Sequence, residues 1–191
     1  DPDALALDLL ANDSDVDHRV LLRVTDPGTR HGNYGSLTVT SDGHASYRLD
    51  NDSAAVQTLG AGQTLVDQFV VAVGDGQASV ANEISIVVQG ANDAPETADD
   101  MASVSEDAGS TAQGNVLAND RDIDQGTTLT VATPGTLMGL YGTLTFEADG
   151  SYSYALDNAL PAVQQLAADE TVSEAFVYEV SDGLERTTGT L

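Results

Sequence analysis

Apolar and polar residues alternate along most of this chain, with the two-residue period of β-strands that bury one face. The alternation is clear in residues 36–40 and 44–49, which flank Asp42-Gly43. An Asp-Gly pair between two alternating runs favours a tight hairpin turn. The sequence therefore predicts a β-hairpin over residues 36–49.

The same signals recur throughout the chain. A second hairpin is predicted around Asp149-Gly150, and further strands and two short helical turns follow from the pattern. The expected strands are 69–73, 84–88, 143–147, 151–156 and 176–180, and the helical turns are 54–59 and 161–166.

The chain is a tandem repeat. Shifted by 107 positions it aligns with itself without a gap from Leu10 to Gly76, and roughly half of the aligned residues are identical. The segment 90–96 contains a proline and reads as a linker. We therefore expect one domain at residues 1–94 and a second at 95–191.

The repeat also suggests where each copy is incomplete. Residues 99–106 have no counterpart in the first copy, and residues 83–89 have none in the second. We expect the first domain to lack its opening strand and the second its closing strand, with exposed edges or strand exchange at the ends. The absence of an initial methionine fits a piece of a longer protein.

The expected fold class is all-β. About seven short strands per ~100 residues, separated by regular turn signals, favour two tandem immunoglobulin-like β-sandwiches, each with one short helical turn. Neither copy contains the cysteines or the tryptophan of an antibody-type core.

Charge excludes several functions. The chain has 31 acidic and 6 basic residues and a formal charge of −25. Nucleic-acid binding requires a basic surface, and an anionic membrane surface would repel this chain. No apolar run approaches the ~20 residues that span a bilayer, so we expect no membrane insertion. There is no cysteine for disulfides or zinc thiolate sites.

An Asn-Asp-x-Asp-x-Asp motif occurs once in each copy. Oxygen ligands at alternate positions of a loop are typical of Ca²⁺ sites. An EF-hand is rejected because its turn glycine is replaced by His18 and Gln125, and its bidentate glutamate by valine. The alternative is a solvated acidic turn whose side chains cap backbone amides. The candidate ligands are Asn12, Asp13, Asp15 and Asp17, and in the second copy Asn119, Asp120, Asp122 and Asp124.

A second acidic cluster surrounds the linker. A cation there would neutralise charges from both domains and stiffen the hinge, whereas the alternative is a flexible charged linker. The cluster contains Asn92, Asp93, Glu96, Asp99, Asp100, Glu106 and Asp107.

Catalytic motifs are missing. The three histidines, His18, His31 and His44, occur only in the first copy and have no partner at a meaningful spacing. No nucleophile elbow, phosphate-binding glycine loop or zinc-protease motif is present. We therefore expect a protein that is not an enzyme.

Several ordered motifs together resemble the VCBS or cadherin-like repeat of large secreted bacterial RTX-type adhesins, including the Rap-type agglutinins of rhizobia. They are Val116-Leu117-Ala118-Asn119-Asp120-x-Asp122-x-Asp124, Gly142-Thr143-Leu144-Thr145, Asp149-Gly150-Ser151-Tyr152-x-Tyr154, Phe176-x-Tyr178-x-Val180-Ser181-Asp182-Gly183 and the linker Gly90-Ala91-Asn92-Asp93-Ala94-Pro95. The resemblance covers nearly the whole chain.

This resemblance implies a calcium-dependent β-sandwich, export by a type I system and an extracellular or cell-surface location. It also implies that Asn92 and Asp93 belong to a calcium-binding linker and that Glu106 takes the place of the family's first-strand glutamate. The implied function is cell–cell adhesion, biofilm formation or binding of acidic exopolysaccharide or other adhesin modules. The alternative is a calcium-rigidified spacer in an adhesin stalk, with no ligand of its own.

Overall fold

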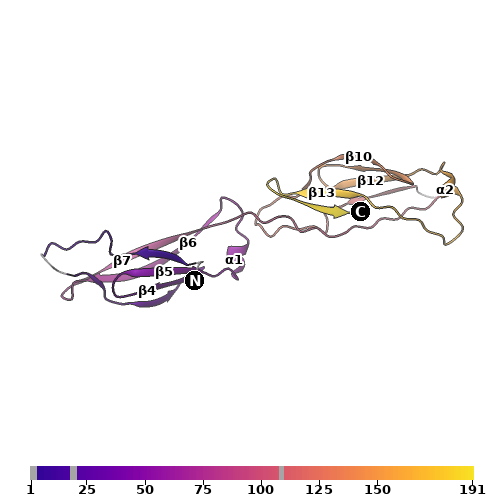
Figure 1. The fold of residues 1–191 in the computed structure, drawn as a ribbon. Helices are drawn as coiled ribbons and strands as arrows, with labels where there is room; N and C mark the ends of the chain where they lie inside the picture. The colour runs from indigo at the N-terminus through magenta and orange to yellow at the C-terminus, as the bar shows by residue number, and fades with distance from the viewer. Residues whose placement is uncertain (1–3, 18–20, 108–109) are drawn as a thin grey trace. The chain divides into compact units, whose positions relative to one another are not determined.

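The computed structural model describes residues 4–17, 21–107 and 110–191. The chain divides into two compact units, residues 1–91 and 92–191, which are described separately (Figure 1). The division follows Ala91, whereas the linker sequence suggested a division after Ala94. No helix among the described residues is long and apolar enough to cross a membrane.

Unit 1 consists of two antiparallel sheets. The strand order is β1-β5-β4-β3 in one sheet and β2-β6-β7 in the other. The elements are β1 Leu5–Asp8, β2 Arg23–Val24, β3 Gly28–His31, β4 Gly35–Val39, β5 His44–Leu49, α1 Ala54–Gln57, β6 Thr64–Gly74 and β7 Ser79–Gln89.

Unit 2 repeats this arrangement strand for strand. Its sheets have the orders β10-β11-β12-β8 and β14-β13-β9, and all pairs are antiparallel. The elements are β8 Thr111–Asn115, β9 Thr130–Val131, β10 Gly135–Met138, β11 Gly142–Phe146, β12 Ser151–Leu156, α2 Pro161–Gln164, β13 Val177–Ser181 and β14 Arg186–Thr190.

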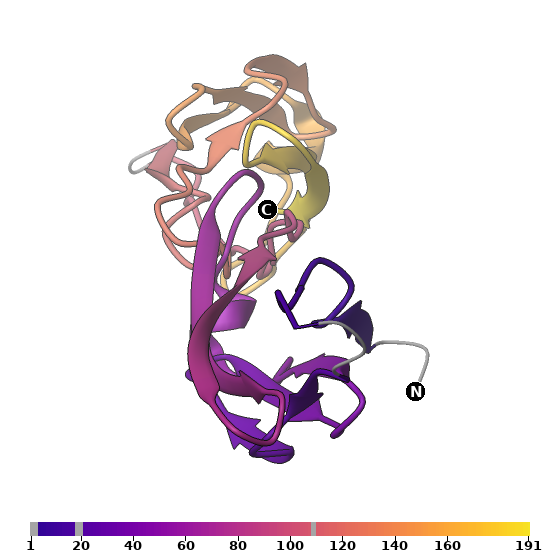
Figure 2. The same cartoon turned by 90° about the vertical axis from the view of Figure 1, so that its left-hand side faces the viewer.

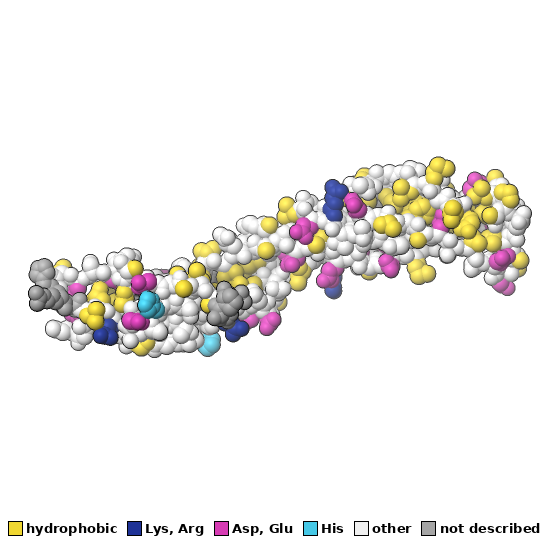
Figure 3. Space-filling model, viewed as in Figure 1, with side chains coloured by type: hydrophobic (Ala, Val, Ile, Leu, Met, Phe, Trp, Pro, Cys, Tyr) yellow, Lys and Arg dark blue, Asp and Glu magenta, His cyan; other side chains and the backbone are white. Residues whose placement is uncertain are grey.

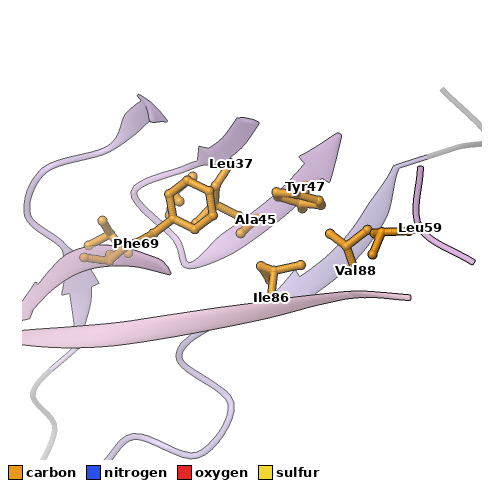
Figure 4. Packing of buried hydrophobic residues seen from close by; sticks show 10 residues of the cluster. Leu37, Ala45, Tyr47, Leu59, Phe69, Ile86 and Val88 are labelled. Carbon is orange, nitrogen blue, oxygen red and sulfur yellow. The ribbon is translucent and has the colours of Figure 1, made fainter. Parts of the chain in front are cut away.

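Each core lies between two sheets because alternate residues of both point inward. In unit 1, Leu37 and Tyr47 from one sheet pack with Phe69 and Ile86 from the other (Figure 4). In unit 2, Leu144 and Phe146 pack with Phe176, Tyr178 and Val180 in the same way. The predicted all-β fold of two tandem sandwiches is confirmed.

The hairpins predicted at the Asp-Gly pairs are also present. Strands β4 and β5 pair from Gly35–Leu49 to Val39–Ala45, and Gly43 has a φ of 89°. Strands β11 and β12 pair equivalently, and Gly150 has a φ of 84°. A positive φ is the conformation that glycine adopts without strain. The two predicted helical turns appear as α1 and α2.

The longest hairpin joins β6 and β7, which are 11 residues each and pair along their whole length (purple to magenta in Figure 2). Inward residues of β6 are buried at 67, 69, 71 and 73. Strand β7 is the outer strand of its sheet, so one of its sides has no strand partner among the described residues.

Candidate metal centre

The Asn-Asp-x-Asp-x-Asp motif of unit 2 lies in the loop between β8 and β9. Its conformation is set locally, because Oδ1 of Asp122 accepts a hydrogen bond from the amide of Asp124 at 2.8 Å. Aspartate favours this two-residue turn. Asp15 and Asp17 form the same turn in unit 1, also at 2.8 Å. The repeated motif therefore encodes a repeated loop geometry.

In unit 2 the segment 92–100 packs onto this loop. Oδ2 of Asp124 accepts the amide of Asp93 at 2.9 Å, and Oδ1 of Asp120 accepts the amide of Ala98 at 2.9 Å. The side-chain amide of Asn119 donates to the carbonyls of Ala98 and Asp99, each at 3.3 Å. The predicted motif and the first part of the predicted junction cluster thus come together within one unit.

Asp182 completes this group of acids. Its Oδ1 accepts the amides of Leu184 and Glu185 at 2.6 Å each, which fixes the turn after β13. Its Oδ2 accepts the side-chain amide of Asn92 at 2.8 Å. Asp182 therefore fixes this turn and also lies beside the acidic loop, where its charge acts on Asp122.

Three carboxylate oxygens of the loop are buried and have no hydrogen-bond partner: Oδ2 of Asp120, Oδ2 of Asp122 and Oδ1 of Asp124. Asp124 as a whole is only 5% exposed. Burying a polar atom without a partner costs roughly 1–3 kcal/mol, so such atoms in a native structure point to a missing partner. The available donor set is anionic oxygen, which suits a hard cation such as Ca²⁺.

The pKa shifts of two loop aspartates also favour a cation at this place. Burial raises the pKa of Asp122, and the neighbouring charges of Asp124, Asp182 and Asp93 raise it further. Burial and the charge of Asp100 raise the pKa of Asp120. Both shifts mean that the charged form is unfavourable without a positive partner. The face drawn in Figure 3 carries few basic side chains, whereas its acidic side chains are spread over both units.

Comparison with known proteins gives the family. The bacterial cadherin-like domain matches residues 2–90 and again residues 92–191. The chain belongs to the bacterial cadherin-like domain family. The predicted resemblance to cadherin-like repeats is therefore confirmed.

This chain is similar in sequence to one known protein and in structure to another. The calcium-binding lectin RapA2 of Rhizobium johnstonii is 28% identical over 209 residues, which cover 95% of this chain and 84% of RapA2. Among solved structures, the chain is similar to the endo-fucoidan hydrolase MfFcnA4 of glycoside hydrolase family 107, at 18% identity and a TM-score of 0.31. That similarity covers 90% of this chain and only 23% of the hydrolase.

The loop of the first cadherin-like domain is more open. Oδ2 of Asp13 is buried without a partner, as in the second domain, but Asn12, Asp15 and Asp17 are exposed. Among the described residues, no hydrogen bond ties another segment to residues 12–17 as residues 92–100 are tied to the loop of the second domain. The His18 position lies outside the described residues, and His31 and His44 lie in β3 and β5.

Two acids of the predicted junction cluster have other surroundings. Glu96 forms an exposed ion pair with Arg121 at 2.6 Å, and the two backbones form a β-bridge. Glu106 is half-buried, and the structure shows no hydrogen bond or ion pair between it and another described residue. Glu96 therefore contacts the loop of the second cadherin-like domain through Arg121, where a cation already pairs with it, whereas no hydrogen bond or ion pair joins Glu106 to the described residues of that loop.

The described residues contain no group of three or more histidine, aspartate or glutamate side chains already arranged to hold a metal ion. The second cadherin-like domain instead provides a loop with buried unpartnered oxygens, flanked by Asp93 and Asp182. These residues fit a calcium ion by donor chemistry, and binding would draw the carboxylates together against their mutual repulsion.

Proposed function

We propose that this chain is an extracellular, non-enzymatic calcium-binding adhesion module made of two bacterial cadherin-like domains. The observation that supports it most strongly is the set of three buried, unpartnered carboxylate oxygens on Asp120, Asp122 and Asp124. The relative RapA2 is a calcium-binding lectin, which supports the same function. The parent protein would be a large adhesin exported by a type I system.

The proposed ligands follow from these contacts. In the second domain Asp120, Asp122 and Asp124 would bind the ion, with Asp93 and Asp182 beside them. Asn92 would hold Asp182 in place through its 2.8 Å hydrogen bond. In the first domain the equivalent proposed ligands are Asn12, Asp13, Asp15 and Asp17.

Calcium binding would make the stability of the module depend on whether it is inside or outside the cell. An ion that binds only the folded chain adds RT ln(1 + [Ca²⁺]/Kd) to stability. A site with a Kd of roughly 10⁻⁴–10⁻³ M would be filled outside a cell and empty inside it. Such a module would be flexible during export and would become rigid when it binds calcium outside the cell.

Thermal melts of the full chain test the calcium part. We expect a higher melting temperature in millimolar Ca²⁺ than in EDTA, and a smaller increase in Mg²⁺, which requires a stricter octahedral geometry. Identical melting temperatures in Ca²⁺ and EDTA would reject the proposal.

The adhesive ligand we propose is an acidic bacterial exopolysaccharide bridged through calcium, or another adhesin module. The lectin relative supports a carbohydrate. A glycan array and an exopolysaccharide pull-down, each in Ca²⁺ and in EDTA, test this. Calcium-dependent capture of acidic glycans is the expected result.

One observation favours a spacer function as the second candidate. Sugar-binding surfaces commonly present an aromatic ring to the ligand, but the ring pairs Tyr47–Phe69, Phe146–Tyr178 and Tyr154–Phe176 all lie in the cores. A stabilising response to calcium with no capture of acidic or neutral glycans would identify the module as a spacer.

A further inference from the structure

Residues 93–98 of unit 2 form a strap that lies across the acidic loop. The strap runs antiparallel to residues 120–124, with contacts at both of its ends and in its middle. In the middle, the amides of Glu96 and Arg121 each donate to the carbonyl of the other residue, at 2.8 Å and 3.0 Å. Pro95 beside Glu96 is buried, and its fixed φ favours an extended chain before it. The strap is therefore held against the loop along its length.

The ends of the strap are bonded to two of the proposed calcium ligands. The amide of Asp93 donates to Oδ2 of Asp124, and the amide of Ala98 donates to Oδ1 of Asp120, each at 2.9 Å. The other oxygen of each carboxylate is buried without a hydrogen-bond partner, and Asp124 as a whole is only 5% exposed. Each of these carboxylates thus holds the strap with one oxygen and leaves the other for an ion.

An ion in solution can reach these buried oxygens only when part of their cover moves. Among the described residues, the strap and the turn after β13 lie against the carboxylates. The turn is fixed by two 2.6 Å hydrogen bonds to Asp182 and by the pairing of β13 with β14. The strap is joined to the loop backbone by one β-bridge, between Glu96 and Arg121. The strap is therefore the part of the cover that can move.

One side-chain contact closes the strap without using a proposed ligand. Nε and Nη2 of Arg121 donate to Oε2 of Glu96, at 2.8 Å and 2.6 Å. The two side chains are 78% and 65% exposed, so the ion pair is open to water and salt. An exposed ion pair shifts an equilibrium by up to about fivefold. A contact of this strength suits the control of a local opening.

We propose that the Glu96–Arg121 pair gates the calcium site of the second cadherin-like domain: it holds the strap closed and so sets the rate at which calcium enters and leaves. The inference rests on the proposed calcium function. Because the ion enters and leaves through the same opening, a weaker pair speeds both steps and changes the Kd much less.

A calcium titration of the isotope-labelled full chain, followed by NMR line shapes, tests the proposal. The line shapes give the release rate and the Kd for each domain separately. Glu96→Gln and Arg121→Ser should each speed release from unit 2 about two- to fivefold, with a smaller change in Kd. The exchanged pair, Glu96→Arg with Arg121→Glu, should restore slow release. Release from unit 1 should be the same in all variants.

Charge alone predicts a different pattern. Loss of the positive Arg121 would by itself slow calcium release, whereas loss of the negative Glu96 would speed it. Faster release in both variants is therefore specific to the gate. The matched control is Glu179→Gln, because Glu179 forms an exposed ion pair with Arg186 that joins β13 to β14 and not the strap to the loop. It should leave the release rate unchanged.

Hydrogen exchange in EDTA reports on the strap without the ion. The amides of Asp93 and Ala98 should exchange about two- to fivefold faster in Glu96→Gln and in Arg121→Ser than in the unchanged chain. Equal exchange, or opposite effects of the two substitutions on calcium release, would overturn the gate alone. The absence of any calcium-dependent shift at residues 119–124 would reject the proposed function and the gate with it.

Discussion

The hydroxyl of Tyr47 donates a hydrogen bond to the fully buried carboxylate of Asp67, with 2.7 Å between the two oxygens. The same carboxylate accepts the amides of Asn33 and Tyr34, at 2.7 Å and 3.2 Å. Tyr47 lies in β5 and Asp67 in β6, so this network joins the two sheets of unit 1. The chain has no cysteine, and a buried polar link of this kind fixes the packing of the sheets.

Unit 2 has the same link with a longer acid. Glu174 accepts the hydroxyl of Tyr154 and the amide of Leu140, both at 2.5 Å. Glycine precedes Asn33 in unit 1 and Leu140 in unit 2, because a Cβ on Gly32 or Gly139 would lie within 2.5 Å of the carboxylate that binds the next amide. The link is therefore a property of the repeat, although its acid differs between the copies.

Removal of this acid should destabilise its own unit. We expect Asp67→Ala to lower the free energy of unfolding of unit 1 by about 3 kcal/mol, because a buried hydroxyl and two amides lose their acceptor. Native-state hydrogen exchange of the full chain reports each unit separately. The exposed Asp52→Ala variant is the matched control. Glu174→Ala should lower the stability of unit 2 and leave that of unit 1 unchanged. Equal protection in Asp67→Ala and Asp52→Ala would contradict the role of the link.

Single ligands should control the calcium response of unit 2. At a hundredfold excess over Kd, calcium adds about 2.7 kcal/mol of stability, and we expect Asp122→Asn to weaken binding at least about tenfold. Asp149→Asn removes the same charge at the exposed β11–β12 turn and should leave the response unchanged. Isothermal titration measures both. If the two variants bound calcium equally well, the ion would not be held by this loop.

Protonation at low pH should partly replace the stabilisation that calcium gives to unit 2. Because the pKa values of Asp120 and Asp122 are raised in the folded unit, protonation favours the folded state, and this stability is lost as pH rises through the folded pKa. In EDTA we therefore expect unit 2 to gain stability as pH falls toward the ordinary aspartate pKa of about 4. Asp182, whose hydrogen bonds lower its pKa against the effect of burial, opposes this change.

The double variant Asp120→Asn, Asp122→Asn provides the control for the acid effect. It should flatten the pH dependence of the melting temperature in EDTA. Saturating calcium should flatten it in the unchanged chain as well. A gain in stability on acidification that is as large in the double variant would assign the effect to other carboxylates.

Alkaline pH should unfold the chain through its buried tyrosines. Burial and adjacent carboxylates raise the pKa values of Tyr47, Tyr154 and Tyr178 in the folded state. The stability that depends on their neutral form is complete below the unfolded value of about 10 and is lost as pH rises toward the folded pKa. Tyrosinate absorbance should therefore appear for these residues only together with unfolding. Tyr178→Phe should remove part of the pH dependence of stability. Reversible ionisation of all tyrosines in a chain that stays folded would contradict the prediction.

The strands could be predicted because alternation and Asp-Gly turns are local signals. Both predicted hairpins and both helical turns follow from residues close together in sequence, and the repeat follows from identical residues at a constant shift of 107 positions. The acidic loop was also a local prediction, and its Asp122–Asp124 turn is a two-residue contact. The neighbours of the loop were harder to assign, because Asp93 and Asp182 lie 31 and 58 positions from Asp124 in the sequence.

The alternation of strand β6 carries a signal for the buried link. Asp67 is in phase with Phe69, Val71 and Val73, so an inward acid was visible in the alternation. Its partner was not visible, since Tyr47 is placed opposite Asp67 only by the packing of the two sheets. The assignment of Glu106, by contrast, rests on family resemblance, and no hydrogen bond or ion pair among the described residues joins it to the loop.

The segment 97–100 and strand β14 run in the same direction, because residue 97 contacts residue 188 and residue 100 contacts residue 190. Tension applied to the two ends of unit 2 would therefore slide these strands past each other. The hydrogen bonds between them would then have to break at the same time, and not one after another as when two strands are separated from one end. A unit fastened in this way would resist pulling better than its thermal stability alone would indicate, as the proposed adhesion function would require.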